Sequence, residues 1–493
     1  MKFKRQSGIL LHPTSLPGNH GIGTIGKEAF DFIDFLAEAG QKLWQILPLG
    51  PTGFGESPYQ CFSSMAGNPL LISLEKLEED GLLSKSDIDD HSGKLARHVD
   101  FEKVRKVKIP LLDKAFGKFI KTGKNTKAFK TFCSQKSVWL DDFALFLSLK
   151  EEFRNKPWNL WPKEARLRDP EALEQYRKKC KERILYHKFI QFEFFKQWKE
   201  VKKYANEKNI RIVGDIPLYV AYDSVDVWTK PENFLLDSKG KPIKVAGVPP
   251  DYFSATGQLW GNPVYNWQYI EKDGFYWWIE RMWASLELCD IVRIDHFRGL
   301  SAFWVVPYGE KTAVKGKWVA APGKKLFKTL IKELGELPVI AEDLGVITPD
   351  VEELRNCFGF PGMKILQFAF DSSEENNYLP HTYTENCVVY TGTHDNNTVL
   401  GWYQNASAGD RKKVKEYIGN IDEGIVKSMI RLAWASVADI AIIPVQDILE
   451  LDEDARMNLP GTSSGNWSWK FRPKDLTPAH AAWLKKLTET YGR

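Results

Sequence analysis

Three acidic residues each follow a short apolar run that is typical of a buried strand. They are Asp295, Glu342 and Asp395. A carboxylate at the C-terminal end of a parallel strand points into a shared mouth, and in a (β/α)8 barrel the chemistry takes place at that mouth. Cleavage of a glycosidic bond needs a nucleophile, an acid/base and a group that holds the sugar ring, so three carboxylates in one mouth suit that reaction.

The neighbours of these acids predict how they differ. Arg293 lies two residues before Asp295, on the same side of a strand, and we expect it to keep Asp295 ionised as the nucleophile. Glu342 follows Val-Ile-Ala, an apolar approach that raises the pKa of a carboxyl and suits a general acid. Asp395 stands beside His394 and suits hydrogen bonds to sugar hydroxyls.

Other interpretations of these residues remain open. A single Asp at the end of a strand is more often a helix N-cap, and Asp343 and Asp350 are candidates for that role. Asp215 fits either role, and His394 is as compatible with a structural histidine as with a sugar ligand. The chain lacks H-E-x-x-H and paired-His spacing, so we predict no catalytic metal and no cofactor. It also lacks G-x-S-x-G, which leaves serine hydrolysis unsupported.

The elements that must position the acids form a repeated pattern of an apolar β-branched run, a Gly/Pro/Asp-rich stretch and an amphipathic segment. Eight such runs are expected to be strands: 7–11, 42–47, 211–216, 290–294, 339–341, 363–368, 388–391 and 439–443. Eight βα units predict an α/β fold, a (β/α)8 TIM barrel with helical and loop insertions in its βα loops.

The spacing of these runs predicts one catalytic domain over residues 1–493. Its barrel core comprises about 1–69 and 206–493, and residues 70–205, rich in Lys, Glu, Leu and Phe at helical spacing, predict a mostly helical insertion. Two smaller insertions, 222–267 and 300–323, are expected to cover the active-site groove. No Ser/Gly linker interrupts the chain, which favours a single body.

Composition excludes several classes of protein. The 493 residues carry 68 basic and 64 acidic side chains, a net charge of +4 that is too small and dispersed to indicate nucleic acid. No apolar stretch is long enough for a secretory signal or a membrane span, so we predict a cytoplasmic protein without a membrane partner. Six scattered cysteines without a CxxC pair are typical of reduced thiols. The 18 tryptophans, several near Gly/Pro loops, exceed what a core needs. About half of these are expected to be ordinary core or surface residues, and the others can cover sugar rings.

Gly21-Ile-Gly-Thr-Ile-Gly26 matches the G-x-G-x-x-G pattern of dinucleotide-binding folds. Nine residues separate the preceding strand from its first glycine, so the turn is not tight. The next strand ends in Leu47-Pro-Leu-Gly50 rather than in an acid that could hold a ribose. A nicotinamide oxidoreductase is therefore an alternative that equilibrium dialysis with a dinucleotide would test.

Motifs along nearly the whole chain resemble the amylomaltases, the 4-α-glucanotransferases or disproportionating enzymes of glycoside hydrolase family 77 in the α-amylase clan. Three contain the acids: Arg293-Ile-Asp-His-Phe-Arg-Gly299, Ile340-Ala-Glu-Asp-Leu-Gly345 and Thr391-Gly-Thr-His-Asp-Asn-Asn397. Others are Leu11–Pro17, Pro48–Gly53, Glu56–Tyr59, Gly214–Pro217, Gly247–Ser254, Leu259–Pro263 and Asn458–Thr462.

The resemblance implies roles for these positions. Asp295 would form a β-glucosyl ester, Glu342 would be the general acid and then the base, and Asp395 would hold hydroxyls of the donor ring. Arg293 and His394 would bind the same ring, with Asp215 assisting and Tyr59 stacking at the cleavage site. The loop 246–254, with Asp251, Tyr252 and Phe253, would arch over the groove together with Asn458–Thr462. Gln258, Trp260 and Asn466 would contact the acceptor.

The expected reaction is the retaining transfer of an α-1,4-glucan segment from a donor glucan to the 4-hydroxyl of an acceptor glucan or glucose. Retention requires working carboxyls about 5–5.5 Å apart. A retaining α-1,4-glucan hydrolase would share all three acids, and a non-catalytic glucan-binding protein would keep the aromatic residues. The latter gains little from three acids that repel one another. The oligomeric state stays open.

Overall fold

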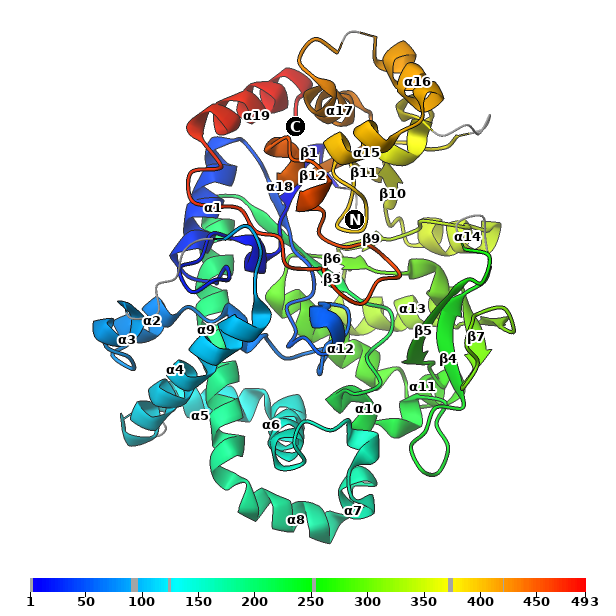
Figure 1. Cartoon of the computed structure of the whole chain (residues 1–493). Coiled ribbons are helices and arrows are strands. Elements are labelled where there is room, and N and C mark those ends of the chain that lie inside the picture. The colour runs from blue at the N-terminus through cyan, green and yellow to red at the C-terminus, as the bar shows by residue number, and fades with distance from the viewer. Residues whose placement is uncertain (1–2, 90–95, 123–125, 251–253, 371–375, 420) are drawn as a thin grey trace.

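Eight parallel strands form the centre of the molecule in the computed structural model, which describes residues 3–89, 96–122, 126–250, 254–370, 376–419 and 421–493 (Figure 1). The strands are β1 (Gln6–Leu10), β2 (Leu43–Gln45), β3 (Arg211–Ile216), β6 (Ile291–Ile294), β9 (Val339–Ala341), β10 (Gly362–Ile365), β11 (Cys387–Tyr390) and β12 (Ile440–Pro444). Their order is β10-β11-β12-β1-β2-β3-β6-β9. Ala341 of β9 donates its N–H to the carbonyl of Pro361, next to β10, across 2.9 Å, so the two outer strands meet. The predicted (β/α)8 barrel is confirmed.

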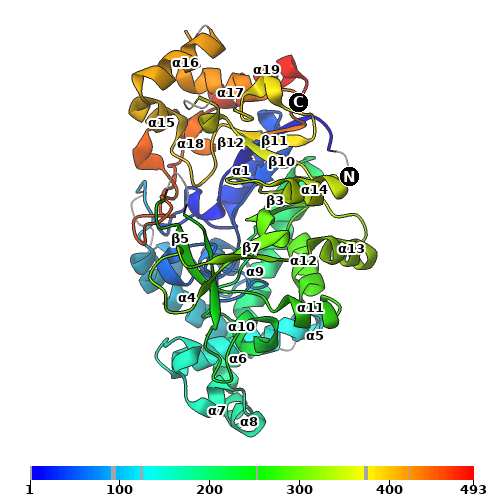
Figure 2. The ribbon, with the colours of Figure 1, turned by 90° about the vertical axis from the view of Figure 1, so that its right-hand side faces the viewer.

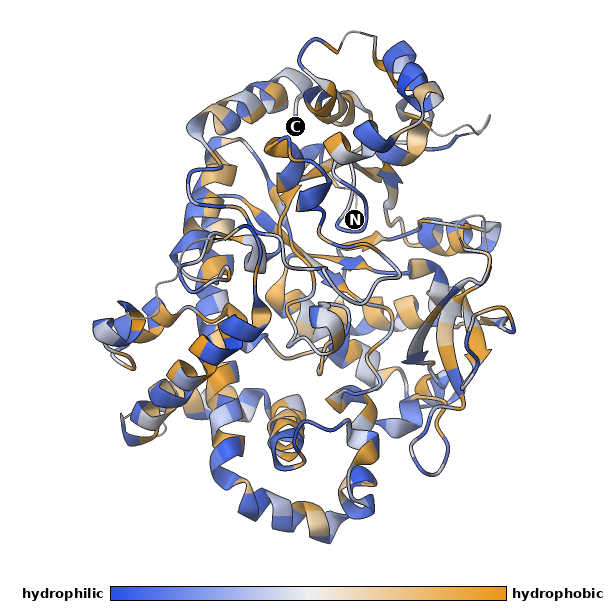
Figure 3. Cartoon of the chain, in the orientation of Figure 1, coloured by the Kyte–Doolittle hydropathy of each residue, from blue (hydrophilic) through white to orange (hydrophobic). Residues whose placement is uncertain are grey.

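Hydrophobic residues on both faces explain why these runs form barrel strands. Every residue of β1, β11 and β12 is buried, as expected for parallel strands whose two faces are covered by the barrel interior and by helices. The central strands are correspondingly dominated by the hydrophobic colour in Figure 3. The expected strand over 363–368 is shorter in the structure, because Leu366–Phe370 forms a 3-10 helix. A short apolar run does not distinguish a strand from a buried helical turn.

Helices surround the barrel on the outside of the strands. They are α1 (Lys27–Glu38), α12 (Tyr276–Leu288), α13 (Gly323–Leu334), α14 (Pro349–Cys357), α15 (Val399–Asn405), α16 (Ala408–Ile418), α17 (Ile425–Ala435), α18 (Val445–Ile448) and α19 (Pro478–Tyr491). Figure 2 shows α15, α16 and α17 together at the end of the molecule opposite to α7 and α8. Within the described ranges, no helix combines the length and the apolar character that a bilayer crossing requires.

The chain between β2 and β3 is mostly helical. Its helices are α2 (Leu74–Glu79), α3 (Lys85–Asp89), α4 (Phe101–Thr122), α5 (Lys127–Gln135), α6 (Ser137–Glu152), α7 (Lys163–Arg166), α8 (Pro170–Lys179) and α9 (Lys181–Glu207). The long helix α9 packs against α4, α5 and α6 and leads into β3. Phenylalanine rings join them, for example Phe119 and Phe189, whose centroids lie 4.6 Å apart.

A second, antiparallel sheet combines two segments that are distant in sequence. It consists of β4 (Lys244–Val248), β5 (Gln258–Pro263), β7 (Ala302–Pro307) and β8 (Lys317–Ala320), in the order β5-β4-β7-β8. The first two strands follow β3, after α10 (Val225–Thr229), and precede α11 (Trp267–Lys272), whereas the last two follow β6. Lys244–Gly247 of β4 pairs with Trp304–Pro307 of β7. The two smaller segments that the sequence marks as insertions therefore form one unit beside the barrel (Figure 1).

The glycine run in the first loop has a local structural reason. A Cβ at Gly23 would lie 2.1 Å from the carbonyl oxygen of Pro13, so only glycine allows the two parts of the loop to approach. The N–H of Gly23 donates to the carbonyl of Thr14 across 3.0 Å. The run therefore serves the packing of the loop onto itself.

Candidate active site

Strand register brings the candidate residues to one end of the barrel. Asp215 of β3 pairs with Arg293 of β6, and Ile294 of β6 pairs with Ala341 of β9. Asp295 and Glu342 are the next residues of these two parallel strands. Paired residues of adjacent strands point to the same side of a sheet, so both carboxyls leave the barrel at its C-terminal end, next to each other.

Arg293 is shared between two carboxylates. One terminal nitrogen donates to both oxygens of Asp215, at 2.9 and 2.7 Å, and the other donates to Oδ1 of Asp295 across 3.1 Å. The Asp215 side chain is 0% exposed, whereas that of Asp295 is 31% exposed. Asp215 is therefore a buried anchor for Arg293, and Asp295 is the carboxyl that remains open at the mouth.

Backbone groups hold Glu342. The N–H of His296 donates to Oε2 across 2.6 Å, and the N–H of Leu344 donates to Oε1 across 2.9 Å. Each carboxyl oxygen thus has its own backbone donor, one from the loop after β6 and one from the loop after β9. This arrangement fixes the direction in which the carboxyl can present a proton.

Asp395 lies in the loop after β11 and is bound by the segment that follows β12. Asn458 donates its side-chain amide to Oδ1 of Asp395 across 2.6 Å, and Arg456 donates to the backbone carbonyl of Asp395 across 2.5 Å. The Nε2 atom of His394 lies 3.4 Å from Oδ1. The Asp395 side chain is still 46% exposed, so it is positioned and accessible at once.

Tyr59 closes one side of the site. Its hydroxyl donates to Oδ2 of Asp215 across 2.8 Å, and its ring stacks on the His394 imidazole with centroids 5.2 Å apart. Trp467 packs against both rings at 5.8 Å. Tyr59 therefore connects the Asp215–Arg293 pair to the His394–Asp395 loop.

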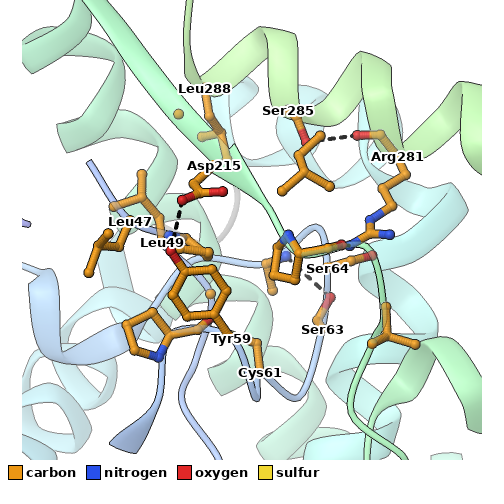
Figure 4. A pocket seen from close by; sticks show the side chains of 18 of the residues that line it. Leu47, Leu49, Tyr59, Cys61, Ser63, Ser64, Asp215, Arg281, Ser285 and Leu288 are labelled. Atoms are coloured by element: carbon orange, nitrogen blue, oxygen red, sulfur yellow. Dashed lines mark hydrogen bonds between the residues drawn. The ribbon is translucent and has the colours of Figure 1, made fainter. Parts of the chain in front are cut away.

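A small cavity lies behind this connection (Figure 4). It has about 70 Å³ of room for water-sized molecules and is lined by residues of β3, of α12 and of the loops that follow β2 and β3. Asp215 and Tyr59, joined by their hydrogen bond, form part of its wall, and Arg281, Ser285 and Leu288 of α12 form another part. The cavity therefore shares Asp215 and Tyr59 with the candidate site, while none of the three candidate acids Asp295, Glu342 and Asp395 lines it.

Burial changes the ionisation of the two adjacent carboxyls. It raises the pKa of Asp295 well above its ordinary value, Arg293 lowers it in part, and the charge of Glu342 raises it further. Burial also raises the pKa of Glu342, against the lowering effects of Arg293 and of the two backbone donors. The raised pKa expected for Glu342 is confirmed. Mutual repulsion between the two acids therefore favours a pair that keeps a proton.

Arg293 acts on Asp295 in the expected direction, since it favours the charged form and lowers the pKa, but burial outweighs this effect and the net pKa of Asp295 is raised. Burial is the main cause of the rise, and the charges of Glu342, Asp215 and Asp395 add to it, while Arg293 gives two of its hydrogen bonds to Asp215 and one to Asp295. Burial also lowers the pKa of His394, so its imidazole is neutral at neutral pH.

The residues expected on the acceptor side lie on two separate segments. Gln258 and Trp260 belong to β5, and the Trp260 indole donates to the Gln258 side chain across 3.1 Å. Trp260 also meets the His296 ring edge to face at 4.7 Å, which places β5 beside the loop of Asp295. Asn466 accepts the N–H of Leu459 across 2.9 Å and so shapes the 458–466 segment. Asp251, Tyr252 and Phe253 lie outside the residues that the structure describes.

Three contributors were missed by the sequence analysis: His296 as a backbone donor, Arg456 and Trp467. His296 stands inside the motif around Asp295, so its position was a signal. Trp467 is one of the tryptophans near Gly/Pro loops, but its packing against Tyr59 and His394 was not predictable, and Arg456 had no signal, because the contacts of both depend on the fold of the segment after β12. Among the described residues, no group of three or more His, Cys, Asp or Glu side chains is arranged to hold a metal ion.

Comparisons with known proteins find relatives along the whole chain. The family model described as 4-alpha-glucanotransferase matches residues 11–477. The chain is similar to a protein of Synechocystis sp. named 4-alpha-glucanotransferase, with 54% identity over 499 residues, covering 100% of this chain and 99% of the relative. A Thermus thermophilus protein of the same name is 48% identical, with 100% of both chains covered.

A solved structure agrees as well. An amylomaltase from Streptococcus agalactiae, in complex with acarbose, superposes with a TM-score of 0.97 and 46% identity, over 99% of this chain and 100% of that chain. The likeness covers the barrel, the helical segment and the antiparallel sheet together. The chain belongs to the 4-alpha-glucanotransferase family.

Proposed function

We propose that the chain transfers a segment of an α-1,4-glucan to the 4-hydroxyl of a second glucan or of glucose, by double displacement on Asp295 and Glu342. The observation that carries this mechanism is that the two acids directly follow the paired residues Ile294 and Ala341, at matching positions after the adjacent strands β6 and β9. Adjacent strands lie about 4.8 Å apart, which suits the separation of about 5–5.5 Å that retention requires.

In the first step, a carboxylate oxygen of Asp295 attacks the anomeric carbon of the donor. The bond between that carbon and the leaving 4-oxygen breaks, and Glu342 gives its proton to the leaving oxygen. A β-glucosyl ester remains on Asp295. The raised pKa of the pair supports this step, because one proton must stay on the pair at neutral pH.

In the second step, Glu342 acts as the base. It removes the proton from the acceptor 4-hydroxyl, whose oxygen attacks the anomeric carbon while the ester bond to Asp295 breaks. The α-linkage is restored, and both carboxyls return to their first state. The backbone donors on Glu342 support this alternation, since they hold the carboxyl in one direction in both protonation states.

The donor ring is held beside these acids. Asp395, anchored by Asn458, accepts hydrogen bonds from ring hydroxyls, and Arg293 and the neutral His394 contribute donors. Tyr59, fixed on Asp215, offers the part of its ring that His394 does not cover for contact with the sugar. Asp215 acts through Arg293 and Tyr59, because both of its oxygens are engaged and its side chain is buried.

Transfer prevails over hydrolysis when a bound acceptor reaches a high effective concentration next to the ester. Trp260 and Gln258, beside the Asp295 loop, hold the acceptor, and Asn466 shapes the segment opposite. The 246–254 loop and Asn458–Thr462 cover the groove in this proposal. The proposal includes a reducing, cytoplasmic environment, which is supported by the six cysteines, all of which are free thiols.

Product analysis tests the proposal. Purified protein is incubated with maltotriose, and the products are separated by chromatography. We expect glucose together with maltopentaose and longer glucans. Glucose and maltose without longer products would show a hydrolase, and unchanged maltotriose would show a binding protein.

A pair of variants on one strand separates catalysis from binding. Asp295→Asn should abolish transfer and retain glucan binding, because the amide cannot form the ester. Asp290→Asn is the matched control, since Asp290 lies at the opposite end of β6 and accepts the N–H of Ile212. If the Asp295→Asn variant transferred glucan as fast as the Asp290→Asn variant, Asp295 would not be the nucleophile.

A further inference from the structure

His296, the residue directly after Asp295, has an unusual backbone conformation. Its φ is 52° and its ψ is 45°, in the left-handed region. This region is uncommon for residues other than glycine and is sterically unfavourable for an L side chain. Such a conformation persists only where the surrounding structure determines it, and it then deserves a functional explanation.

The left-handed conformation has a direct consequence for Glu342. It turns the N–H of His296 away from the barrel ladder and toward Oε2 of Glu342, at 2.6 Å. The next residue, Phe297, donates its N–H to the backbone carbonyl of Glu342 across 3.0 Å. Two successive N–H groups thus point at the same residue, one at its side chain and one at its main chain.

Packing of the imidazole maintains this conformation. The ring meets Trp260 edge to face at 4.7 Å and lies 6.3 Å from the Tyr219 ring. A Cβ at Gly299 would lie 3.0 Å from Cδ2 of His296, so the ring fills the space above that glycine. Burial lowers the pKa of His296 to about 3, and the ring is neutral. Its effect on Glu342 is therefore not that of a positive charge.

We propose that His296 is a positioning residue whose left-handed backbone aims its N–H at Oε2 of Glu342 and thereby orients this carboxyl for proton transfer. The inference rests on the proposed role of Glu342 as acid and base. The main-chain N–H of His296 orients the Glu342 carboxyl, and the side chain of His296 only holds the turn. Trp260 and Tyr219, whose rings lie next to the imidazole, hold the turn in place.

Other charged groups also act on Glu342 and must be kept constant in a test. Arg293 of β6 and the N–H of Leu344 stabilise its ionised form, whereas Asp343 favours the protonated form. Asp295 opposes its ionisation from the neighbouring strand. None of these groups is changed by a substitution at position 296, so a change in the titration of Glu342 reports on the N–H of residue 296.

The test compares His296→Gly, His296→Asn and His296→Val through the pH dependence of kcat/KM on maltotriose. Gly and Asn adopt positive φ readily, whereas a β-branched residue does not. We expect the basic limb of the kcat/KM profile, which reports the pKa of Glu342, to stay in place for His296→Gly and His296→Asn. For Val it should move up by about one pH unit, because one charge-assisted hydrogen bond to the carboxylate is lost. Val should also lower kcat roughly 10- to 100-fold.

Two controls keep the result interpretable. Arg154→Val places the same side chain at a φ of 55° far from the barrel mouth. It should lower the melting temperature without moving the basic limb. If His296→Val does not fold, His296→Ala provides a smaller shift in the same direction. A basic limb that is equally displaced in the Gly, Asn and Val variants would overturn the proposal in favour of the imidazole. Equal losses of activity with no displacement would overturn it too.

Failure of the underlying mechanism is recognised separately. Glu342→Gln should remove the basic limb, since it cannot donate or accept the transferred proton. If Glu342→Gln retained that limb, the role of Glu342 itself would be wrong, whatever the variants at position 296 did.

Discussion

The side-chain amide of Asn458 donates to Oδ1 of Asp395 across 2.6 Å, although the two residues are 63 positions apart in the chain. The N–H of Asn458 also donates to the carbonyl of His394 across 3.0 Å. The segment after β12 is therefore a part of the ring-binding site. It determines where the accessible carboxylate of Asp395 points.

We predict that Asn458→Ala weakens transition-state binding. Loss of a hydrogen bond to a charged group costs about 1.5–3 kcal/mol, which corresponds to a decrease of roughly 10- to 100-fold in kcat/KM. Asn458→Asp should be more severe, because it places two carboxylates in contact. Kinetics on maltotriose measures both. Activity of Asn458→Asp above that of Asn458→Ala would contradict this assignment.

Asp215→Asn should affect stability as well as activity. The substitution leaves the buried Arg293 guanidinium without its main counter-charge, and breaking such a pair costs about 3–5 kcal/mol. Unfolding in urea measures the loss. Asp31→Asn is the control, because the pair of Asp31 with Lys27 lies on the surface and its removal should cost less than about 1 kcal/mol. Equal losses in the two variants would show that Asp215 is not the anchor of Arg293.

The charge of Arg293 should set the position of the pH profile. Arg293 lowers the pKa of both Asp295 and Glu342. Removing the charge in Arg293→Gln raises both pKa values, so both limbs of kcat/KM should move to higher pH. Arg293→Lys keeps the charge and loses the two-pronged geometry, so its limbs should stay near those of the wild type while its activity falls. If the two limbs of the kcat/KM profile of Arg293→Gln stayed in place or moved to lower pH, the charge of Arg293 would not set the pKa values of Asp295 and Glu342.

A buried carboxyl beneath the Asp395 loop should make stability depend on pH. Asp447 of α18 accepts the Thr391 hydroxyl at 2.6 Å and the Val399 N–H at 2.9 Å, the two ends of that loop. Burial raises its pKa from 3.8 to about 6. The folded state therefore binds the proton more tightly than the unfolded state. Stability from this group is complete below about pH 4 and is lost as the pH rises to 6 and beyond, on the order of 3 kcal/mol.

Asp447→Asn tests this directly, because an amide accepts the Val399 N–H without a charge. We expect the variant to gain in free energy of unfolding relative to the wild type at pH 8 and to differ little at pH 4. Urea unfolding at the two pH values provides the measurement. The same difference at both values would mean that Asp447 does not titrate with folding.

The barrel and its three acids were predictable from sequence because both depend on local pattern. A run such as Val388–Tyr390 is apolar on both faces, which is typical of a parallel strand, and the acid that follows it must lie at the C-terminal end. The pKa of Glu342 followed from its apolar approach for the same reason.

The remaining features depend on contacts that the local pattern does not contain. Strand β8 has the sequence Lys-Trp-Val-Ala and is largely exposed, so nothing in it indicates that it pairs with β7 or that β7 pairs with β4. The buried role of Asp215 follows from its register opposite Arg293, which a single strand cannot show. The αL conformation of His296 also had no sequence signal, because glycine or asparagine would be expected there.

The antiparallel sheet links two tasks that could otherwise have evolved separately. Strand β7 begins seven residues after Asp295 and is hydrogen-bonded to β4, which in turn pairs with the strand of Trp260. A substitution that tilts β5 to admit a different acceptor will therefore also displace β4 and β7, and with them the turn that carries Asp295. Variants selected for a new product length should arise together with altered rates of ester formation, and compensating changes should appear along β7 rather than in the barrel.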